Sequence, residues 1–270
     1  MQITPCQNET YEYYNNELKY YYFAEQVCSL PPISAYISES KYFKYSSDSN
    51  FEYKFNILSN SLDFHEKTTR KLILKGEKEK TYIYKMPILQ IKNLPFGKPY
   101  FTYHGETEIK CIGNRDKKKE KCIIKFTDDE AGAFQGIVVD KNNKIQYNLR
   151  GSWKKNIEMK YINEDRWKTL WEIDSSEKYL ENGISLKSTR KYYLPRFSYE
   201  LNNGRGIFRD YLRDTDSRLR KDIIEYEEGN LQNSQKINEK LVQKNNPMLT
   251  PIYFERKEDK FGNVYHFLEK

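Results

Sequence analysis

Apolar and polar residues alternate along much of the chain between residues 18 and 161, in short runs that polar turns separate. The clearest runs span residues 51–57, 82–88 and 145–149, where every second residue is apolar. A repeat of two residues puts alternate side chains on opposite faces of a β-strand. We therefore predict a strongly curved antiparallel sheet over most of residues 18–161, arranged as a barrel or a sandwich.

Turn signals mark the ends of several of these strands. Lys141-Asn142-Asn143-Lys144 stands between two apolar runs and predicts a tight hairpin, and Asn202-Asn203-Gly204 predicts a loop. Pro31 and Pro32 predict the end of the strand over residues 20–27, because proline has no N–H to donate to a central ladder.

The pattern changes after Leu201, where charged residues surround isolated apolar ones. This spacing predicts helices between about residues 206 and 244. Gly229 separates two helical segments, and Pro247 ends the second, because the residue before a proline disfavours the helical conformation. Residues 252–267 return to a strand-like spacing of aromatic residues.

The sequence contains no internal repeat, linker or second domain boundary. We therefore predict one domain over residues 1–270, with a β part at residues 1–200 and a C-terminal helical part and strand-like tail at residues 201–270. The expected fold class is mainly β with C-terminal helices.

Composition favours a folded protein with a sizeable core. Hydrophobic residues make up 37% and aromatic residues 15% of the chain, with 24 Tyr, which suits pleated strands rather than disorder. No run approaches the roughly 18 apolar residues of a membrane-spanning helix, and the N-terminus carries no secretion signal. We expect a cytoplasmic protein.

The spacing of cysteine and histidine residues gives no metal signature. The four cysteines and three histidines are scattered, so we expect no metal site and no cofactor. Cys111 and Cys122 could face each other across a hairpin, but reduced thiols are the expected state without an export signal. His104-Gly105-Glu106 suggests an acid–base pair, yet such a histidine is more often structural, and we predict no catalysis.

The net charge of +7 suits an anionic partner, which could be nucleic acid or the cytoplasmic leaflet of a membrane. A lysine-rich run lies between strand-like segments and predicts a solvated hairpin tip, which could also contact lipid headgroups. The candidate membrane-contact residues in this run are Lys117, Lys118, Lys119 and Lys121.

Residues 24–38, AEQVCSLPPISAYIS, resemble the fingerprint EQVSHHPPISA of the lipid-transfer domains of the oxysterol-binding protein family. Other segments are similar to further family motifs in the same order. They are ETYE at residues 9–12, YKMPILQIKNLPFGKPYFTYHGETEI at 84–109, VVDKNNKIQYNLRGSW at 138–153, DTDSRLRKD at 214–222 and IYFERKEDKFGNVYHF at 252–267. The resemblance therefore covers almost the whole chain.

The resemblance implies an almost closed antiparallel barrel around a lipid tunnel, followed by helices. In the family, two fingerprint histidines bind the phosphates of phosphatidylinositol 4-phosphate, and these positions are Ser29 and Leu30 in this chain. Thr4 stands at a family asparagine that meets the headgroup, and Met1 stands at a family lysine. The resemblance thus implies a headgroup site without its usual polar groups.

The last helix of the family carries a lysine, a glutamate and an arginine at intervals of four residues, which places them on one face. Asn238, Val242 and Asn246 stand at these positions. Three lysines keep the same spacing but are offset by two residues, which rotates them by about 200° around the helix. We expect them to face solvent, although a slip of two residues would turn them inward; they are Lys236, Lys240 and Lys244.

The family segment that supplies the lid, the N-terminal helices and the first strands has no counterpart in these residues. The expected barrel is therefore incomplete, or a partner or an upstream segment completes it, since an open edge strand invites aggregation. The sequence leaves these alternatives open.

Two hypotheses for function follow from the resemblance. The first is a domain that binds or transfers a sterol or another lipid, with Thr4, Ser29 and Leu30 at the mouth of an apolar tunnel. The alternative is a scaffold or membrane-surface interaction protein that keeps only the barrel. Nucleic-acid binding is not expected, because the tyrosines follow strand periodicity and no recognition motif accompanies them.

Overall fold

The structure is a computed structural model, and it describes residues 4–112, 120–173, 209–259 and 264–268. Strands dominate the described residues up to position 173, and two α-helices and a short strand pair follow. The predicted fold class, mainly β with C-terminal helices, is confirmed. The sheet extends beyond residues 18–161 at both ends, because residues 10–15 and 168–172 are also strands.

The strands of the large sheet follow one another along the chain. Their bounds are β1 Thr10–Asn15, β2 Tyr20–Ser29, β3 Pro32–Glu39, β4 Phe43–Ser49, β5 Phe51–Asn56, β6 Ser61–Glu66, β7 Arg70–Leu74, β8 Lys80–Tyr84, β9 Ile88–Lys92, β10 Tyr100–Ile112, β11 Lys121–Thr127, β12 Ala133–Val139, β13 Ile145–Ser152, β14 Asn156–Tyr161 and β15 Lys168–Glu172.

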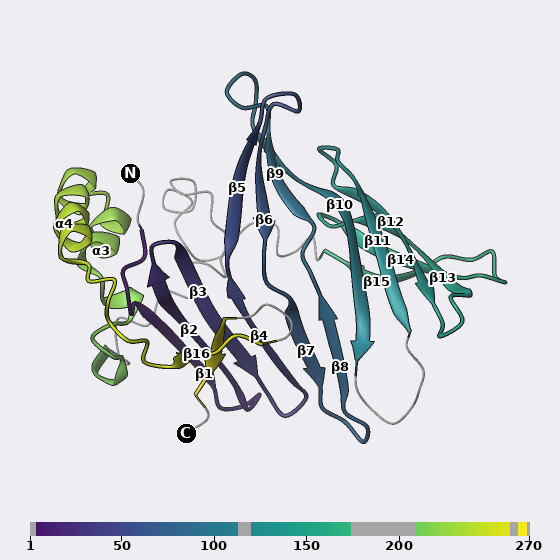
Figure 1. Ribbon diagram of the computed structural model, residues 1–270, viewed down its shortest axis with the longest axis horizontal. Coiled ribbons are helices and arrows are strands. Elements are labelled where there is room, and N and C mark those ends of the chain that lie inside the picture. Colours follow the sequence, from purple (N-terminus) through teal and green to yellow (C-terminus); the bar gives the residue numbers. More distant parts are fainter. Residues whose placement is uncertain (1–3, 113–119, 174–208, 260–263, 269–270) are drawn as a thin grey trace.

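Within the described residues, these strands form one 15-stranded antiparallel sheet with the main order β1-β2-β3-β4-β7-β8-β10-β11-β12-β13-β14-β15. The long strand β10 joins two branches, because its first half pairs with β9 and its second half pairs with β8. A side branch of β5, β6 and β9 rises from this junction (Figure 1). The described part of the sheet is curved but not closed, since β1 and β15 are not paired with each other.

Two predicted turns are confirmed. Asp140 Oδ1 accepts hydrogen bonds from the N–H groups of Asn142 (2.8 Å) and Lys144 (3.0 Å), and Asn143 has a φ of 59°, as a tight hairpin requires. The strand before the prolines ends at Ser29, and β3 begins at Pro32. The predicted loop at residues 202–204 lies outside the described residues.

The main core lies on one face of β2 and β3. Phe23 and Val27 of β2 and alternate residues of β3 are buried there, because a strand turns every second side chain to the same face. The C-terminal strands β16 (Phe254–Arg256) and β17 (Tyr265–Phe267) cover this face, with the buried Phe254 against the core. The described strands of the tail predicted at residues 252–267 therefore pack against the core.

Two buried carboxylates attach the C-terminal strands to the sheet. Glu25 of β2 accepts hydrogen bonds from the N–H groups of Ile252 (2.6 Å) and Tyr253 (2.8 Å). Asp48 Oδ2 of β4 accepts from the N–H groups of Val264 (2.7 Å) and Tyr265 (3.0 Å). Burial raises the pKa of both carboxyl groups, and the donated hydrogen bonds partly offset that rise.

The two α-helices end where the sequence predicts. Two short 3₁₀ helices, η2 Arg209–Tyr211 and η3 Ser217–Leu219, precede α3 Lys221–Glu228 and α4 Leu231–Lys244. Gly229 ends α3 with a φ of 90°, a left-handed conformation that favours glycine, and α4 ends before Pro247. None of the helices in the described part of the chain is long and apolar enough to cross a membrane.

Replacing Glu25 by glutamine should lower the free energy of unfolding by about 2 kcal/mol, because at least one backbone N–H would lose its buried acceptor. Urea unfolding at neutral pH measures this change. Glu17→Gln, at an exposed position of the β1–β2 turn, is the matched control and should change little. Equal stability of the two variants would contradict the role of Glu25.

Candidate functional site

The fingerprint turn joins β2 to β3 and carries two of the predicted site residues. Ser29 pairs with Pro32 across the turn, and its Oγ is buried without a hydrogen-bond partner among the described residues. Leu30 is 81% exposed at the apex. The other polar groups of the segment have structural roles, since Ser34 Oγ donates to Gln26 Oε1 at 2.6 Å.

Residues 4–9 run between the fingerprint turn and the end of α4. Gln7 donates from its backbone N–H to Asn245 Oδ1 (2.8 Å) and from Nε2 to the carbonyl oxygen of Val27 (2.8 Å). Asn8 Nδ2 donates to the carbonyl oxygen of Thr250 (2.7 Å). The structure thus brings residues 7 and 8 together with the fingerprint strand, 20 residues away, and with the segment after α4, about 240 residues away in the sequence.

A buried ionic network connects Thr4 with Asn238. Arg220 donates from Nη1 to the carbonyl oxygen of Thr4 (2.9 Å) and to Glu9 Oε2 (2.5 Å). Its Nη2 donates to Asp222 Oδ2 (2.6 Å), which also accepts from Asn238 Nδ2 (2.9 Å). Burial would raise the pKa of Asp222, but the hydrogen bonds from Arg220 and Asn238 outweigh it and hold that pKa below its usual range.

This network explains two motif segments at once. Glu9 opens the ETYE segment, and Arg220 and Asp222 belong to the DTDSRLRKD segment. In the same segment Arg218 Nη2 donates to Asp216 Oδ2 (2.7 Å) and to the carbonyl oxygen of Glu12 (2.6 Å). The Glu9–Arg220 ion pair and the hydrogen bond from Arg218 to the carbonyl oxygen of Glu12 join the two segments and hold the C-terminal region against β1.

The remaining predicted site residues lie on α4 and just beyond it. Asn238 is buried and committed to Asp222, whereas Val242 and Asn246 are exposed. Asn246 Oδ1 accepts from the N–H of Met248 at 3.1 Å, within its own turn. The three lysines offset by two residues are all exposed to solvent; they are Lys236, Lys240 and Lys244.

A row of tyrosines crosses the face of the sheet that points away from the main core. The sequence pattern alone did not single out this row. Ring centroids are 6.1 Å apart for Tyr11 and Tyr22, and 6.4 Å apart for Tyr22 and Tyr36. Tyr36 and Tyr45 follow at 5.9 Å, and the hydroxyl oxygens of Tyr45 and Tyr84 are 3.3 Å apart. These five half-buried residues, the tyrosine ladder, span β1, β2, β3, β4 and β8.

The tyrosine ladder lies on the face away from the main core. Tyr22 precedes the buried Phe23, and Tyr36 stands between the buried Ala35 and Ile37. Adjacent residues of a strand point to opposite faces, so the ladder faces away from β16 and β17. Burial raises the pKa of Tyr22 to about 12, which keeps its hydroxyl neutral.

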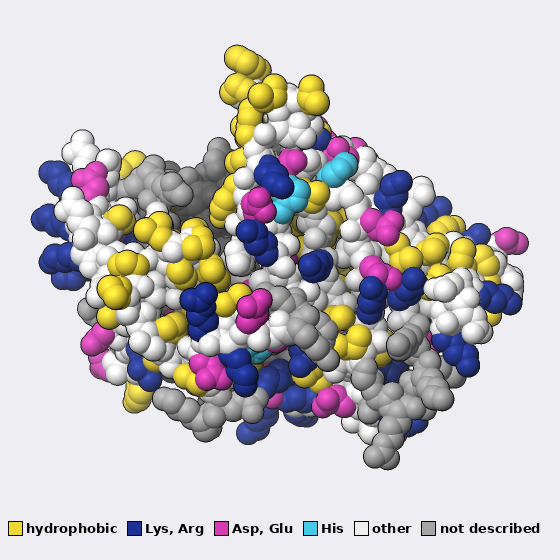
Figure 2. Space-filling view, viewed as in Figure 1, with side chains coloured by type: hydrophobic (Ala, Val, Ile, Leu, Met, Phe, Trp, Pro, Cys, Tyr) yellow, Lys and Arg dark blue, Asp and Glu magenta, His cyan; other side chains and the backbone are white. Residues whose placement is uncertain are grey.

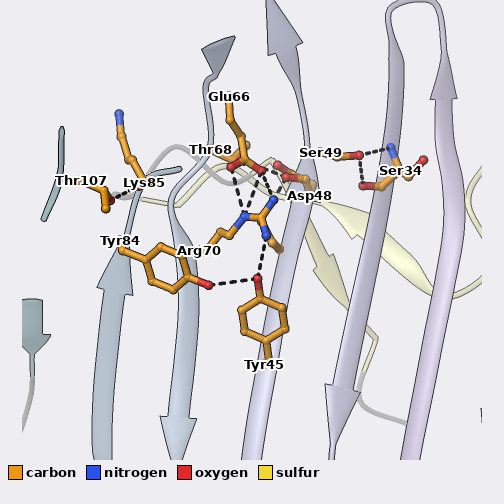
Figure 3. Close-up of polar contacts among 11 residues, drawn as sticks. Ser34, Tyr45, Asp48, Ser49, Glu66, Thr68, Arg70, Tyr84, Lys85 and Thr107 are labelled. Carbon is orange, nitrogen blue, oxygen red and sulfur yellow. Dashed lines mark hydrogen bonds and ion pairs between the residues drawn. The ribbon is translucent and has the colours of Figure 1, made fainter. Parts of the chain in front are cut away.

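Near its β8 end the tyrosine ladder crosses β7, where an ion pair lies between Tyr45 and Tyr84 (Figure 3). Arg70 Nη2 lies 3.0 Å from Glu66 Oε1, and Arg70 Nη1 donates to the hydroxyl of Tyr45 at 3.1 Å. At the other end, the Arg218 guanidinium lies 4.4 Å from the centre of the Tyr11 ring. Both arginines are paired with carboxylates, so the ladder presents aromatic rings and neutral hydroxyls.

A cavity of about 530 Å³ lies elsewhere on the sheet and includes none of the predicted site residues. Its lining is mixed, with polar and charged side chains beside one tryptophan. The lining residues are Ile123, Lys125, Gln135, Gly136, Ile137, Asn148, Leu149, Arg150 and Trp167.

The other sequence candidates have separate places. Lys121 lies 3.2 Å from Glu108, and residues 117–119 of the lysine run are outside the described residues. His104 Nδ1 lies 3.4 Å from Asp128 on an exposed part of β10. Cys122 is opposite Ile109 rather than Cys111, both thiols are free, and burial raises the pKa of Cys122 to about 11.

Comparison with known proteins agrees with this arrangement of motifs. A model of the family described as oxysterol-binding protein matches residues 4–267. The chain belongs to this family.

Human oxysterol-binding protein-related protein 6 is 28% identical over 239 residues, which cover 85% of this chain and 23% of that protein. Oxysterol-binding protein-related protein 1B of Arabidopsis thaliana is 30% identical over 233 residues, 84% of this chain and 44% of that protein. The chain therefore spans less than half the length of these relatives.

Solved structures share the family fold. The Osh1 ORD domain in complex with cholesterol superposes with a TM-score of 0.82 at 22% identity, covering 98% of this chain and 67% of that one. The Osh3 ORD of Saccharomyces cerevisiae in complex with PI(4)P superposes with a TM-score of 0.79 at 25% identity, covering 98% of this chain and 69% of that one. This oxysterol-binding protein family member thus has the sheet of the ORD fold.

Replacing Arg220 by methionine should lower the free energy of unfolding by about 3–5 kcal/mol, because it leaves two buried carboxylates without their cation. The side chains of Arg220 and Asp222 are only 9% and 0% exposed. Urea unfolding measures the loss, and Arg166→Met at an exposed position is the matched control. A loss below about 1 kcal/mol would contradict the proposed importance of the network.

Proposed function

We propose that this chain binds a sterol or another lipid with a weakly charged head, and that it transfers this lipid between membranes. The tyrosine ladder is the observation that carries the proposal. Its rings offer a broad apolar surface, and its neutral hydroxyls can pair with a hydroxyl or ester group of the ligand. Lipid binding of this kind needs no covalent chemistry, so no catalytic step is part of the proposal.

The similarity to proteins of known ligand supports the lipid class. The superposed Osh1 and Osh3 domains were solved with cholesterol and with PI(4)P. We extend lipid binding to this chain but not the charged headgroup, because none of the described positions matched to the headgroup site carries a positive charge. They are Thr4, Ser29, Leu30, Asn238, Val242 and Asn246.

The network beside these positions supports the same proposal. Arg220 lies close to Thr4, but two carboxylates already pair with it, Glu9 and Asp222. A phosphate placed there would compete with buried ion pairs and would meet a network whose formal charge is negative. A ligand with a neutral head avoids this cost.

We also propose that the protein acts in the cytoplasm as a peripheral membrane protein. The net charge of +7 favours an anionic leaflet, and the lysine run at residues 117–121 is the candidate contact. The single-domain organisation of residues 1–270 is part of this proposal.

Purified chain should retain a lipid that native mass spectrometry or solvent extraction identifies. Tyr22→Ala/Tyr36→Ala should reduce binding of a fluorescent sterol about tenfold, because both rings leave the centre of the tyrosine ladder. Tyr42→Ala, at an exposed position outside the ladder, should leave binding unchanged. Equal binding by both variants would count against the ladder as the ligand surface.

Phosphatidylinositol 4-phosphate should not bind in the family manner. Each lost charge-assisted hydrogen bond is worth about 1.5–3 kcal/mol, and several losses exceed the roughly 8 kcal/mol of micromolar binding. Ser29→His/Leu30→His should not restore binding, because the lysine and arginine positions of the family remain uncharged. A headgroup-competition assay with tight uptake by the unchanged chain would overturn this expectation.

Attachment to anionic bilayers through the lysine run should weaken as salt concentration rises. Each lysine close to the surface contributes about 1 kcal/mol, and salt screens this attraction. Co-sedimentation with phosphatidylserine vesicles at low and physiological salt measures it. Charge reversal of residues 117–119 should remove the salt-dependent part of binding, and an unchanged salt dependence would contradict this role.

A scaffold that keeps only the sheet is the second candidate. The unclosed sheet in the described part of the chain favours it, because a shallow surface holds a lipid less firmly than a tunnel. Extraction distinguishes the two functions, since a scaffold should purify without a stoichiometric lipid.

A further inference from the structure

Two neighbouring loops at one end of the side branch expose large apolar side chains. Ile57 and Leu58 lie in the β5–β6 turn and are 82% and 100% exposed, and Phe96 in the β9–β10 loop is 82% exposed. The loops are adjacent because Ser61 of β6 pairs with Lys92 of β9. We call Ile57, Leu58 and Phe96 the apolar tip, and Figure 2 shows hydrophobic side chains gathered at this projecting end of the molecule.

The backbone of the apolar tip satisfies many of its own hydrogen bonds. Asn56 Oδ1 accepts from the N–H groups of Leu58 (3.1 Å) and Ser59 (3.3 Å). The N–H of Leu94 donates to the carbonyl oxygen of Asn60 at 3.2 Å and ties the two loops together. Backbone groups paired in this way can leave water at little cost, so the tip suits an apolar environment.

The two loop segments that carry the apolar tip are basic, although Lys54 lies 3.7 Å from Glu52. Residues 53–60 and 93–101 include Lys54 and Lys98 and no aspartate or glutamate. Lysine can bury its aliphatic stem beside apolar neighbours while its ammonium reaches water or anionic headgroups. A projecting apolar surface with a basic border therefore fits a lipid bilayer.

The apolar tip lies at the same end of the sheet as the fingerprint turn. β2 and β4 run in the same direction because each is antiparallel to β3. β5 continues upward from β4 after a single residue, so the turns after β2 and after β5 both face the upper side of Figure 1. A membrane at the tip would thus lie on the side of the protein where Leu30 is exposed.

We propose that the apolar tip inserts into the headgroup region of a lipid bilayer and orients the fingerprint end of the sheet towards the membrane. This inference rests on the proposed peripheral membrane function and assigns its contact to residues outside the lysine run. The apolar tip projects from the molecule, and a fluid bilayer can adapt to such a projecting apolar surface. Because the contact is apolar, its contribution to binding persists at high salt.

Vesicle partitioning of the full chain tests the insertion. Leu58→Ser/Phe96→Ser should lower the partition coefficient about tenfold or more on phosphatidylcholine and on phosphatidylcholine–phosphatidylserine vesicles, at both low and high salt. Leu18→Ser, an exposed leucine in the β1–β2 turn at the opposite end of the sheet, is the matched control and should bind as the unchanged chain does. Equal partitioning of the tip variant and the control overturns the proposal.

Fluorescence reports the depth of insertion. In the difference spectrum against the unchanged chain, the tryptophan of Leu58→Trp should shift to the blue with vesicles and be quenched by brominated lipid. The tryptophan of Leu18→Trp should do neither. A Leu58→Trp signal that ignores brominated lipid overturns the proposal.

Two further measurements distinguish bilayer insertion of the apolar tip from self-association and from the proposed lipid-binding function. Light scattering without vesicles tests self-association through the tip. If the unchanged chain is a dimer, and the tip variant is a monomer that binds vesicles as the unchanged chain does, the tip binds a second copy and the proposal fails. Lipid extraction of the purified chain tests the proposed lipid-binding function by itself. Tip-dependent vesicle binding without an extracted lipid supports the tip and overturns that function.

Discussion

Two neighbouring carboxylates, Glu9 and Glu25, hold the C-terminal part of the chain against the first strands of the sheet. Thr10, next to Glu9, pairs with Glu25 in the β1–β2 ladder, so the backbones of the two acidic residues lie close to each other where β1 begins beside the middle of β2. Glu9 pairs with Arg220, and Glu25 accepts backbone N–H groups from residues 252 and 253. A buried carboxylate without its hydrogen-bond donors would destabilise the folded state, so these contacts favour one arrangement of the C-terminal residues.

This constraint affects both faces of the sheet. Attaching β16 and β17 to one face buries Phe23, Ala35 and Ile37 there, and it leaves the tyrosine ladder on the other face. The first four rings of the ladder lie across the strands with neighbouring centroids 5.9–6.4 Å apart, which stabilises the sheet and keeps this surface amphipathic. The sheet therefore has one apolar face covered by the C-terminal strands and one amphipathic aromatic face.

The same contacts occupy charged and polar side chains near the fingerprint turn. Arg220 is neutralised by buried carboxylates, and Asn238 donates its amide to Asp222 instead of facing a ligand. Ser29 and Leu30 add no charge at the turn. The charged motif residues of this member of the oxysterol-binding protein family thus take part in contacts that maintain the fold.

Local sequence determined the strands, the hairpin at residues 141–144, the strand end at Pro31 and Pro32, and the helix break at Gly229. Each depends on residues a few positions apart, through side-chain period or backbone dihedral preference. The ordered motifs also indicated the family. Sequence did not reveal the tyrosine ladder, the partners of Arg220 or the role of Asn238, although the tyrosines at residues 20–22 and 36 were a visible signal. Those contacts join residues up to 216 positions apart, as between Thr4 and Arg220. Only strand order, register and the docking of α4 decide which side chains meet, because the local period fixes the face of a residue but not its neighbour on the next strand.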